Sequence, residues 1–163
     1  MDNRYNRHNR RKYSLKVHIV LVTKYRKQLL KDSIADDVKQ KIFDIANTYG
    51  YEIIAIETDK DHIHFLLIYD TTDRVCDIVK IVKQETTCYL WHKYSSFLSK
   101  QYWKKKIFWS DGYFACSIGE VSSTTIQKYI VGYTDVYFYT GGIVENESDF
   151  ATSLDNWEIC SQW

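Results

Sequence analysis

Short runs of β-branched and aliphatic residues alternate along the chain with longer segments in which apolar residues recur at helical spacing. The first kind of segment predicts β-strands and the second predicts amphipathic helices. Two segments, residues 33–48 and 74–98, predict helices. Ser33 is expected to cap the first helix and Gly50 to end it. Strands are predicted at four places: residues 15–23, 51–57, 62–69 and 113–118.

The predicted elements follow one another as strand, helix, strand, strand, helix, strand. The acidic turn at residues 58–61 is short enough to join the second and third strands as a hairpin. Ser122 or Ser123 can begin a further helix that carries Ile126 and Tyr129. The sequence therefore predicts an α+β fold, a ferredoxin-like βαββαβ sandwich with one antiparallel sheet, followed by a C-terminal helix that carries the tyrosine.

Basic residues are confined to the first four fifths of the chain. All 22 Lys and Arg lie at or before Lys128, which gives a net charge of +7 up to that residue and −6 over the last 35 residues. We expect a basic flexible arm at residues 1–12, one domain at residues 13–133 and a divergent acidic tail at residues 134–163. A basic body suits a polyanionic partner, although an unevenly charged solvated surface explains the same balance.

The composition excludes several classes of protein. No stretch approaches the roughly 18 apolar residues of a membrane span, and Met1 leads into charged residues instead of a secretory leader. The four cysteines are scattered without a CxxC pair, so neither a disulfide framework nor a zinc clip is predicted. We expect a cytoplasmic protein that makes no contact with membranes.

The sharpest chemical feature is the pair His62 and His64 in the third predicted strand. Residues two apart in a strand point to the same face, so both imidazoles should project side by side while Ile63 enters the opposite layer. Two such imidazoles can share a divalent metal and leave positions for a substrate oxygen. A purely structural pair of histidines fits the same pattern.

Other residues could take part in chemistry around this pair. Tyr129 could act as a nucleophile, although a core or surface aromatic residue fits as well. The basic aromatic segment at residues 102–109 could track a phosphate backbone and stack on bases, or simply cover the edge of the core. Charge and position suggest three DNA contacts: Lys24, Arg26 and Lys27. Three acids could support the histidines or form a polar turn: Glu57, Asp59 and Asp61.

Three ordered segments of the chain resemble one known family. They are KVHIVLVTKYRKQLL, ETDKDHIHFLLIY and FWSDGYFACSIGEVSSTTIQKYI. Together they resemble the HUH-superfamily single-tyrosine transposases of the smallest bacterial insertion sequences, with the REP-associated tyrosine transposases as wider relatives. The resemblance runs from about residue 12 to residue 130, and the ordered triple match is far more specific than any one segment.

The resemblance implies a complete reaction. A DNA transposase of this kind binds single-stranded DNA hairpins at the element ends, and Mg²⁺ or Mn²⁺ held by two histidines polarises the scissile phosphate. His62 and His64 match these ligands, and Tyr129 matches the tyrosine that forms a 5′-phosphotyrosine intermediate. The family also implies a homodimer, in which the tyrosine helix of one subunit completes the site of the other.

The chain departs from the family one helical turn after the tyrosine. The family places there a glutamine that serves as the third metal ligand, whereas this sequence has Tyr133 preceded by Gly132. A neutral phenol is a poor ligand for a hard divalent ion, and Asp135 could supply an oxygen instead. The alternative is therefore a catalytically impaired protein, derived from such a transposase, that still binds single-stranded DNA hairpins. An RNA-binding ferredoxin-like module is a third possibility, but the third strand carries histidines where stacking rings would be needed.

Overall fold

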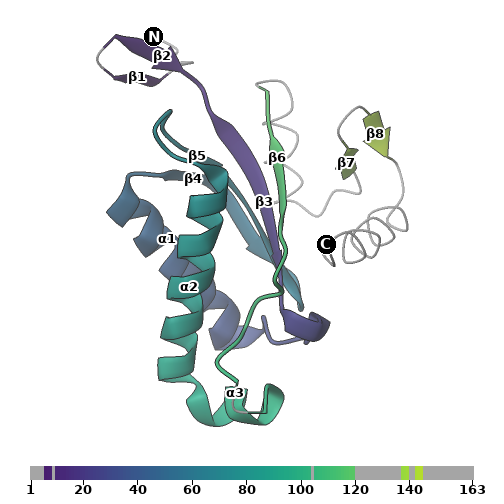
Figure 1. The fold of residues 1–163 in the computed structure, drawn as a ribbon. Helices are drawn as coiled ribbons and strands as arrows, with labels where there is room; N and C mark the ends of the chain where they lie inside the picture. Colours follow the sequence, from purple (N-terminus) through teal and green to yellow (C-terminus); the bar gives the residue numbers. More distant parts are fainter. Residues whose placement is uncertain (1–5, 9, 104, 120–136, 140–141, 145–163) are drawn as a thin grey trace.

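A four-stranded antiparallel sheet forms the centre of the computed structural model, with helices packed on one face (Figure 1). The structure describes residues 6–8, 10–103, 105–119, 137–139 and 142–144. In the sheet the strands are ordered β4-β5-β3-β6, which is the strand order of a ferredoxin-like fold. Their bounds are Lys16–Val22 for β3, Glu52–Thr58 for β4, His62–Ile68 for β5 and Phe114–Ser117 for β6. The predicted fold class is confirmed, and the predicted tyrosine helix lies outside the described residues.

The face of the sheet toward the helices carries the main core. The inward positions of β3 and β5 alternate as expected for a half-covered sheet, and all of them are buried: Val17, Ile19, Leu21, Ile63, Phe65 and Leu67. Helix α1, Asp32–Tyr49, packs on them with apolar residues at helical spacing: Ile34, Val38, Ile42 and Ile45. Because neighbouring residues point to opposite faces, the alternate positions of β3 and β5 form a second face.

Helix α1 ends where the sequence predicted and begins differently. Gly50 adopts φ +78°, the left-handed conformation that glycine takes without steric cost, and its N–H bonds to the Ala46 carbonyl. The expectation that Ser33 is the N-cap is wrong. The helix begins at Asp32, and the backbone carbonyl of Lys31 accepts from the amides of Ile34 and Ala35.

The predicted helix at residues 74–98 is divided in two. Helix α2 spans Val75–Lys93 and helix α3 spans Ser95–Gln101. At Tyr94 the backbone turns to φ −119°, ψ 27°, so its amide ends α2 on Leu90 while its carbonyl starts α3. The Tyr94 hydroxyl donates to the Asp37 carboxylate of α1, which fixes this break against the neighbouring helix.

Two short hairpins lie outside the main sheet. Strand β1, Asn6–His8, pairs antiparallel with β2, Arg11–Tyr13, so part of the expected basic arm is a hairpin (Figure 1). Strand β7, Tyr137–Tyr139, pairs with β8, Gly142–Val144, in the segment that the sequence predicted as acidic tail. The first of these hairpins lies in a segment that was expected to be a flexible arm.

Most aromatic side chains of the connection between α3 and β6 are part of the core, which favours covering the core over stacking on bases. Tyr102, Phe108 and Trp109 are buried, whereas Trp103 is 91% exposed. Trp109 forms an antiparallel bridge with Thr23 at the end of β3. Its indole N–H donates to the buried Thr86 hydroxyl of α2 at 2.8 Å, so this one residue ties the sheet to the helix layer.

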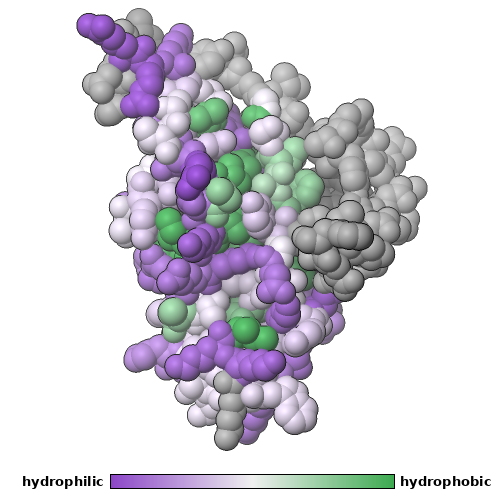
Figure 2. Space-filling view, in the orientation of Figure 1, coloured by the Kyte–Doolittle hydropathy of each residue, from purple (hydrophilic) through white to green (hydrophobic). Residues whose placement is uncertain are grey.

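The surface on the helix side is mixed in character. Figure 2 shows hydrophilic residues over much of this side and hydrophobic residues gathered between α2 and β6. A groove of about 530 Å³ is lined there by residues that include Val17, Tyr69, Val75 and Tyr113. Among the residues that the structure describes, no helix is long and apolar enough to cross a membrane.

Candidate metal and DNA-processing site

The two histidines of β5 lie side by side, as their spacing predicted. The ring centroids of His62 and His64 are 5.6 Å apart, with the ring planes inclined at 61°. Ile63 between them is fully buried in the helix-side core, which places both imidazoles on the opposite face. The pairing of β5 with β3 sets Val22 beside His62 and Val20 beside His64, so the pair stands on one of the two central strands, with His62 at its first position.

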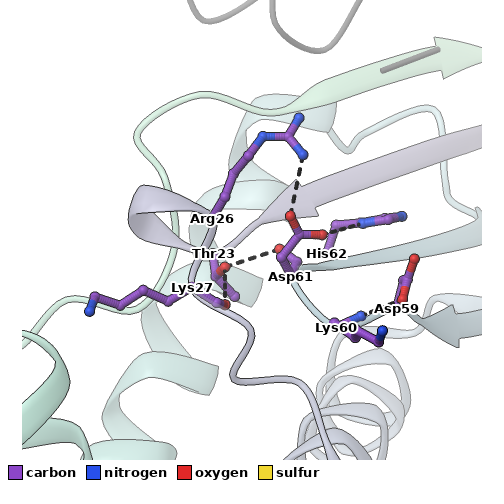
Figure 3. Close-up of polar contacts among 7 residues, drawn as sticks. All are labelled: Thr23, Arg26, Lys27, Asp59, Lys60, Asp61 and His62. Atoms are coloured by element: carbon purple, nitrogen blue, oxygen red, sulfur yellow. Dashed lines mark hydrogen bonds and ion pairs between the residues drawn. The ribbon is translucent and has the colours of Figure 1, made fainter. Parts of the chain in front are cut away.

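A carboxylate and a guanidinium support His62 (Figure 3). Asp61 Oδ1 lies 2.8 Å from His62 Nδ1, and Arg26 Nη1 lies 3.3 Å from Asp61 Oδ2. The hydrogen bond with His62 is the main reason why the pKa of Asp61 lies below its ordinary value. With Nδ1 engaged by a carboxylate, the other ring nitrogen, Nε2, is the one available to a metal.

The other two candidate acids have different partners. Glu57 pairs with Lys39 at 2.9 Å and accepts a hydrogen bond from the Thr58 amide. Burial acts to raise the pKa of Glu57, but these hydrogen bonds hold it below the ordinary value. Asp59 accepts from the Lys60 amide at the tip of the hairpin. The three acids that the sequence could not distinguish therefore separate into one that supports His62 and two that stabilise the local structure.

His18 is a site residue that sequence reasoning missed. It lies on β3, its ring centroid is 5.9 Å from that of His64, and its other ring neighbour is Phe114 at 6.1 Å. Within the described residues its buried Nε2 has no hydrogen-bond partner. Only the register between β3 and β5 brings His18 diagonally next to His64, and no local spacing in the sequence carries that signal.

Burial keeps two of these imidazoles neutral at neutral pH. It lowers the pKa of His18 to about 4. Burial lowers the pKa of His64 to about 3, with smaller effects from the charges of His18 and His62. A neutral imidazole is the form that binds a metal, so His64 is in the state that a metal ligand needs, and two imidazoles on one face are donors that suit a divalent cation. Among the described residues, no group of three acidic, histidine or cysteine side chains is placed to hold a metal ion.

The predicted DNA contacts lie in a tight turn directly after β3. The 3-10 helix η1, Lys24–Arg26, has left-handed backbone at Tyr25 and Arg26, with φ of 60° and 48°. Lys24 pairs with Asp111 at 2.5 Å. The Lys27 ammonium lies 3.5 Å from Gln101 Oε1 and 5.9 Å from the centre of the Tyr102 ring. All three predicted cations therefore have protein partners, and their contact with DNA stays a prediction.

Three predicted site residues fall outside the described part of the chain: Tyr129, Tyr133 and Asp135. Their assignments as nucleophile and as possible third ligands therefore stay predictions. The described residues supply the histidine pair and its supporting groups.

Solved transposases share this fold. A crystal structure of a transposase from Deinococcus radiodurans R1 superposes with a TM-score of 0.65 at 30% identity, over 77% of this chain and 95% of that one. The REP-associated tyrosine transposase, in a structure bound to a REP hairpin, gives a TM-score of 0.54 at 15% identity, over 77% of this chain and 70% of that one. The second likeness shows the fold alone.

The sequence itself identifies the family. The chain belongs to the IS200-like transposases, whose family model matches residues 11–132. It is 32% identical over 118 residues to the ISDra2 transposase of Deinococcus radiodurans, an alignment that covers 72% of this chain and 83% of that protein. It is 26% identical over 119 residues to the IS200 transposase of Salmonella typhimurium, covering 73% and 76%. The predicted resemblance is confirmed, and with it a DNA-cleaving and DNA-rejoining role.

Proposed function

We propose that this transposase cuts and rejoins single-stranded DNA at insertion-sequence ends through a 5′-phosphotyrosine on Tyr129, with Mg²⁺ or Mn²⁺ held by His62 and His64. The observation that carries the proposal is the supported histidine pair: two imidazoles with centroids 5.6 Å apart on one sheet face, one of them fixed by Asp61. The family membership makes strand transfer the relevant chemistry. The hairpin-bound REP-associated transposase, which shares the fold, supports folded single strands as the substrate.

In this mechanism each group of the chain has one task. The His62 and His64 imidazoles hold the cation, which when bound draws negative charge from the scissile phosphate and orients it. Asp61 fixes the ring of His62. The Tyr129 hydroxyl gives its proton to water as its oxygen attacks phosphorus in line. The bond from phosphorus to the 3′-oxygen breaks, and that oxygen takes a proton from water as the released 3′-OH. Rejoining reverses these steps on a new 3′-OH, so no external energy source is consumed.

A homodimer is part of the proposal. The described residues of one subunit supply two histidines and no complete metal site. In this proposal the tyrosine helix of a second subunit brings Tyr129 to the pair, together with an oxygen ligand from Tyr133 or Asp135. Lys24 and Lys27, on the turn after β3, are proposed to contact the DNA backbone next to the site.

Tyr133 favours a second candidate function. It stands where the resemblance places a glutamine ligand, and a phenol binds hard cations weakly. A protein so altered would keep hairpin binding and lose efficient cleavage. The two functions differ in one observable, a covalent link between protein and DNA.

The decisive experiment incubates the protein with labelled single-stranded DNA carrying the element end and Mg²⁺ or Mn²⁺, followed by a denaturing protein gel. The proposal expects a covalent band that disappears in Tyr129→Phe and in His64→Ala. Tyr49→Phe and His92→Ala are matched controls, because both residues lie on the helices outside the site and should leave the band intact. A band that survives in Tyr129→Phe overturns the proposed nucleophile. DNA binding in a native gel without any covalent band supports the second candidate.

A further inference from the structure

The turn after β3 forms hydrogen bonds with both the backbone and the side chain of Asp61 (Figure 3). The Thr23 amide donates to the Asp61 carbonyl at 2.8 Å, and the Thr23 hydroxyl lies 3.1 Å from the same oxygen and 2.7 Å from the Lys27 carbonyl. Arg26 reaches the carboxylate from the same turn. Two residues within four positions of the end of β3, Thr23 and Arg26, therefore hold Asp61 in place.

The two carboxylate oxygens of Asp61 are divided between two donors. Oδ2 faces the Arg26 guanidinium and Oδ1 faces Nδ1 of His62. A carboxylate held in this way can only accept a hydrogen bond, so it selects the His62 tautomer with the proton on Nδ1 and leaves Nε2 as an acceptor. The three side chains are partly shielded from water, at 32%, 21% and 15% exposure along the series from Arg26 to His62.

The backbone of the turn is strained to deliver this contact. Tyr25 and Arg26 both have positive φ, in a region that residues with side chains rarely occupy. Such strain persists only where the surrounding structure enforces it. If the chain continued straight on from β3, it would not pass over Asp61. The left-handed turn is therefore what brings Arg26 to the Asp61 carboxylate.

We propose that Arg26 is a positioning residue, which fixes the Asp61 carboxylate so that His62 presents Nε2 to the catalytic cation. This inference rests on the proposed function, because it concerns the metal that His62 and His64 would hold. It also changes the interpretation of Arg26, which the charge pattern alone assigned to DNA. The Arg26 guanidinium contacts Asp61, and Asp61 in turn contacts His62, so Arg26 acts on His62 within the protein.

The first test needs neither metal nor DNA. Long-range ¹H–¹⁵N correlations on labelled protein report which nitrogen of each histidine carries the proton, and His62→Gln assigns the signal. The expected result is His62 protonated on Nδ1 in the wild type and a mixture of tautomers in Arg26→Gln. In Asp61→Asn, Arg26 would hold the new amide oxygen and turn the amide nitrogen toward His62, which moves the proton to Nε2. An unchanged His62 tautomer in both variants would overturn the proposal.

The second test measures Mn²⁺ affinity by electron paramagnetic resonance on the dimer without DNA. Loss of a supporting group lowers metal affinity by about 10–100-fold, and we expect the lower end for Arg26→Gln and the upper end for Asp61→Asn. The direction of the change for Arg26→Gln distinguishes positioning from simple electrostatics. Removing a positive charge near the bound cation should by Coulomb's law raise the affinity for Mn²⁺, whereas loss of positioning lowers it. Lys27→Gln, which removes the same charge from the same turn without touching Asp61, is the matched control and should leave affinity equal or higher.

The double variant Arg26→Gln/Asp61→Asn separates positioning from other effects. If Arg26 acts through Asp61, the double variant binds Mn²⁺ no more weakly than Asp61→Asn alone. Fully additive losses would mean that Arg26 acts by another route and would overturn the proposal. Equal Mn²⁺ binding by wild type and His64→Ala would defeat the proposed metal site instead, and the tautomer measurement would then decide the role of Arg26 by itself.

Discussion

The hydrogen bond between Trp109 and Thr86 offers the sharpest test of how the sheet and helix layers are joined. Trp109 is buried, and its indole N–H donates to the hydroxyl of Thr86, which is fully buried and itself donates to the Val82 carbonyl at 2.6 Å. Thr86→Val keeps the shape and the β-branching of the side chain. It removes the acceptor and leaves the indole N–H buried without a partner.

The expected cost follows from that unpaired donor. An unsatisfied buried N–H costs about 1–3 kcal/mol, and the methyl group that replaces the hydroxyl recovers part of it. The Val82 carbonyl loses only its second donor, since it lies inside α2. We expect a net loss of about 1–2 kcal/mol in the free energy of unfolding, or roughly 2–8 °C in Tm for a chain of this size.

Urea unfolding followed by tryptophan fluorescence measures this loss, with Thr87→Val on the same helix as the matched control. Thr87 is partly exposed and should change stability by less than about 0.5 kcal/mol when substituted. Trp109→Phe removes the donor as well, so adding Thr86→Val to that background should cost little. Equal or greater stability of Thr86→Val in the wild-type background would refute the reasoning.

Three further predictions concern the partly buried Lys83 ammonium, an ion pair and the proposed C-terminal ligand. Lys83→Met removes the ammonium that donates to the three successive carbonyls of residues 110–112, and it should lower the free energy of unfolding by about 1–3 kcal/mol in the same urea assay. Lys80 lies one turn earlier and is exposed, so the control Lys80→Met should change that free energy by less than about 0.5 kcal/mol. The hydrogen bond from Lys93 is the main reason why the pKa of Asp37 lies below 3.8, so the ion pair stabilises the fold above pH 3.8. The difference in Tm between wild type and Asp37→Asn should therefore disappear as the pH falls below 3.8. A difference that stays constant with pH would contradict this prediction. Tyr133→Gln should increase the yield of the covalent DNA band, and no gain would favour a ligand from elsewhere in the tail.

Local patterns were sufficient for much of the fold. The four strands, the order of the elements and the shared face of His62 and His64 follow from side-chain periodicity, which needs only neighbouring residues. Gly50 as a helix end follows from its conformational freedom. These features depend on interactions within a few positions of the chain, and such interactions are written in the sequence.

The features that sequence reasoning missed depend on distant contacts. His18 reaches His64 only through strand register, and the break at Tyr94 contains neither glycine nor proline and is fixed by Asp37 across the helix pair. The selection of Asp61 among three acids depends on a left-handed turn at non-glycine residues, which propensity argues against. In each case the deciding partner lies on another element, where no spacing rule applies.

The central position of β3 affects how the protein can be synthesised. This strand is synthesised before both of its neighbours in the sheet, and one of them is β6, whose Phe114 pairs with Val20. Until residue 117 has left the exit tunnel, the strand that carries His18 therefore has one bare edge, open to pairing with other nascent chains. Pairing over such sequence distances is also intrinsically slow. The sheet can therefore be completed only after β6 has been synthesised, and products that terminate before β6 should aggregate.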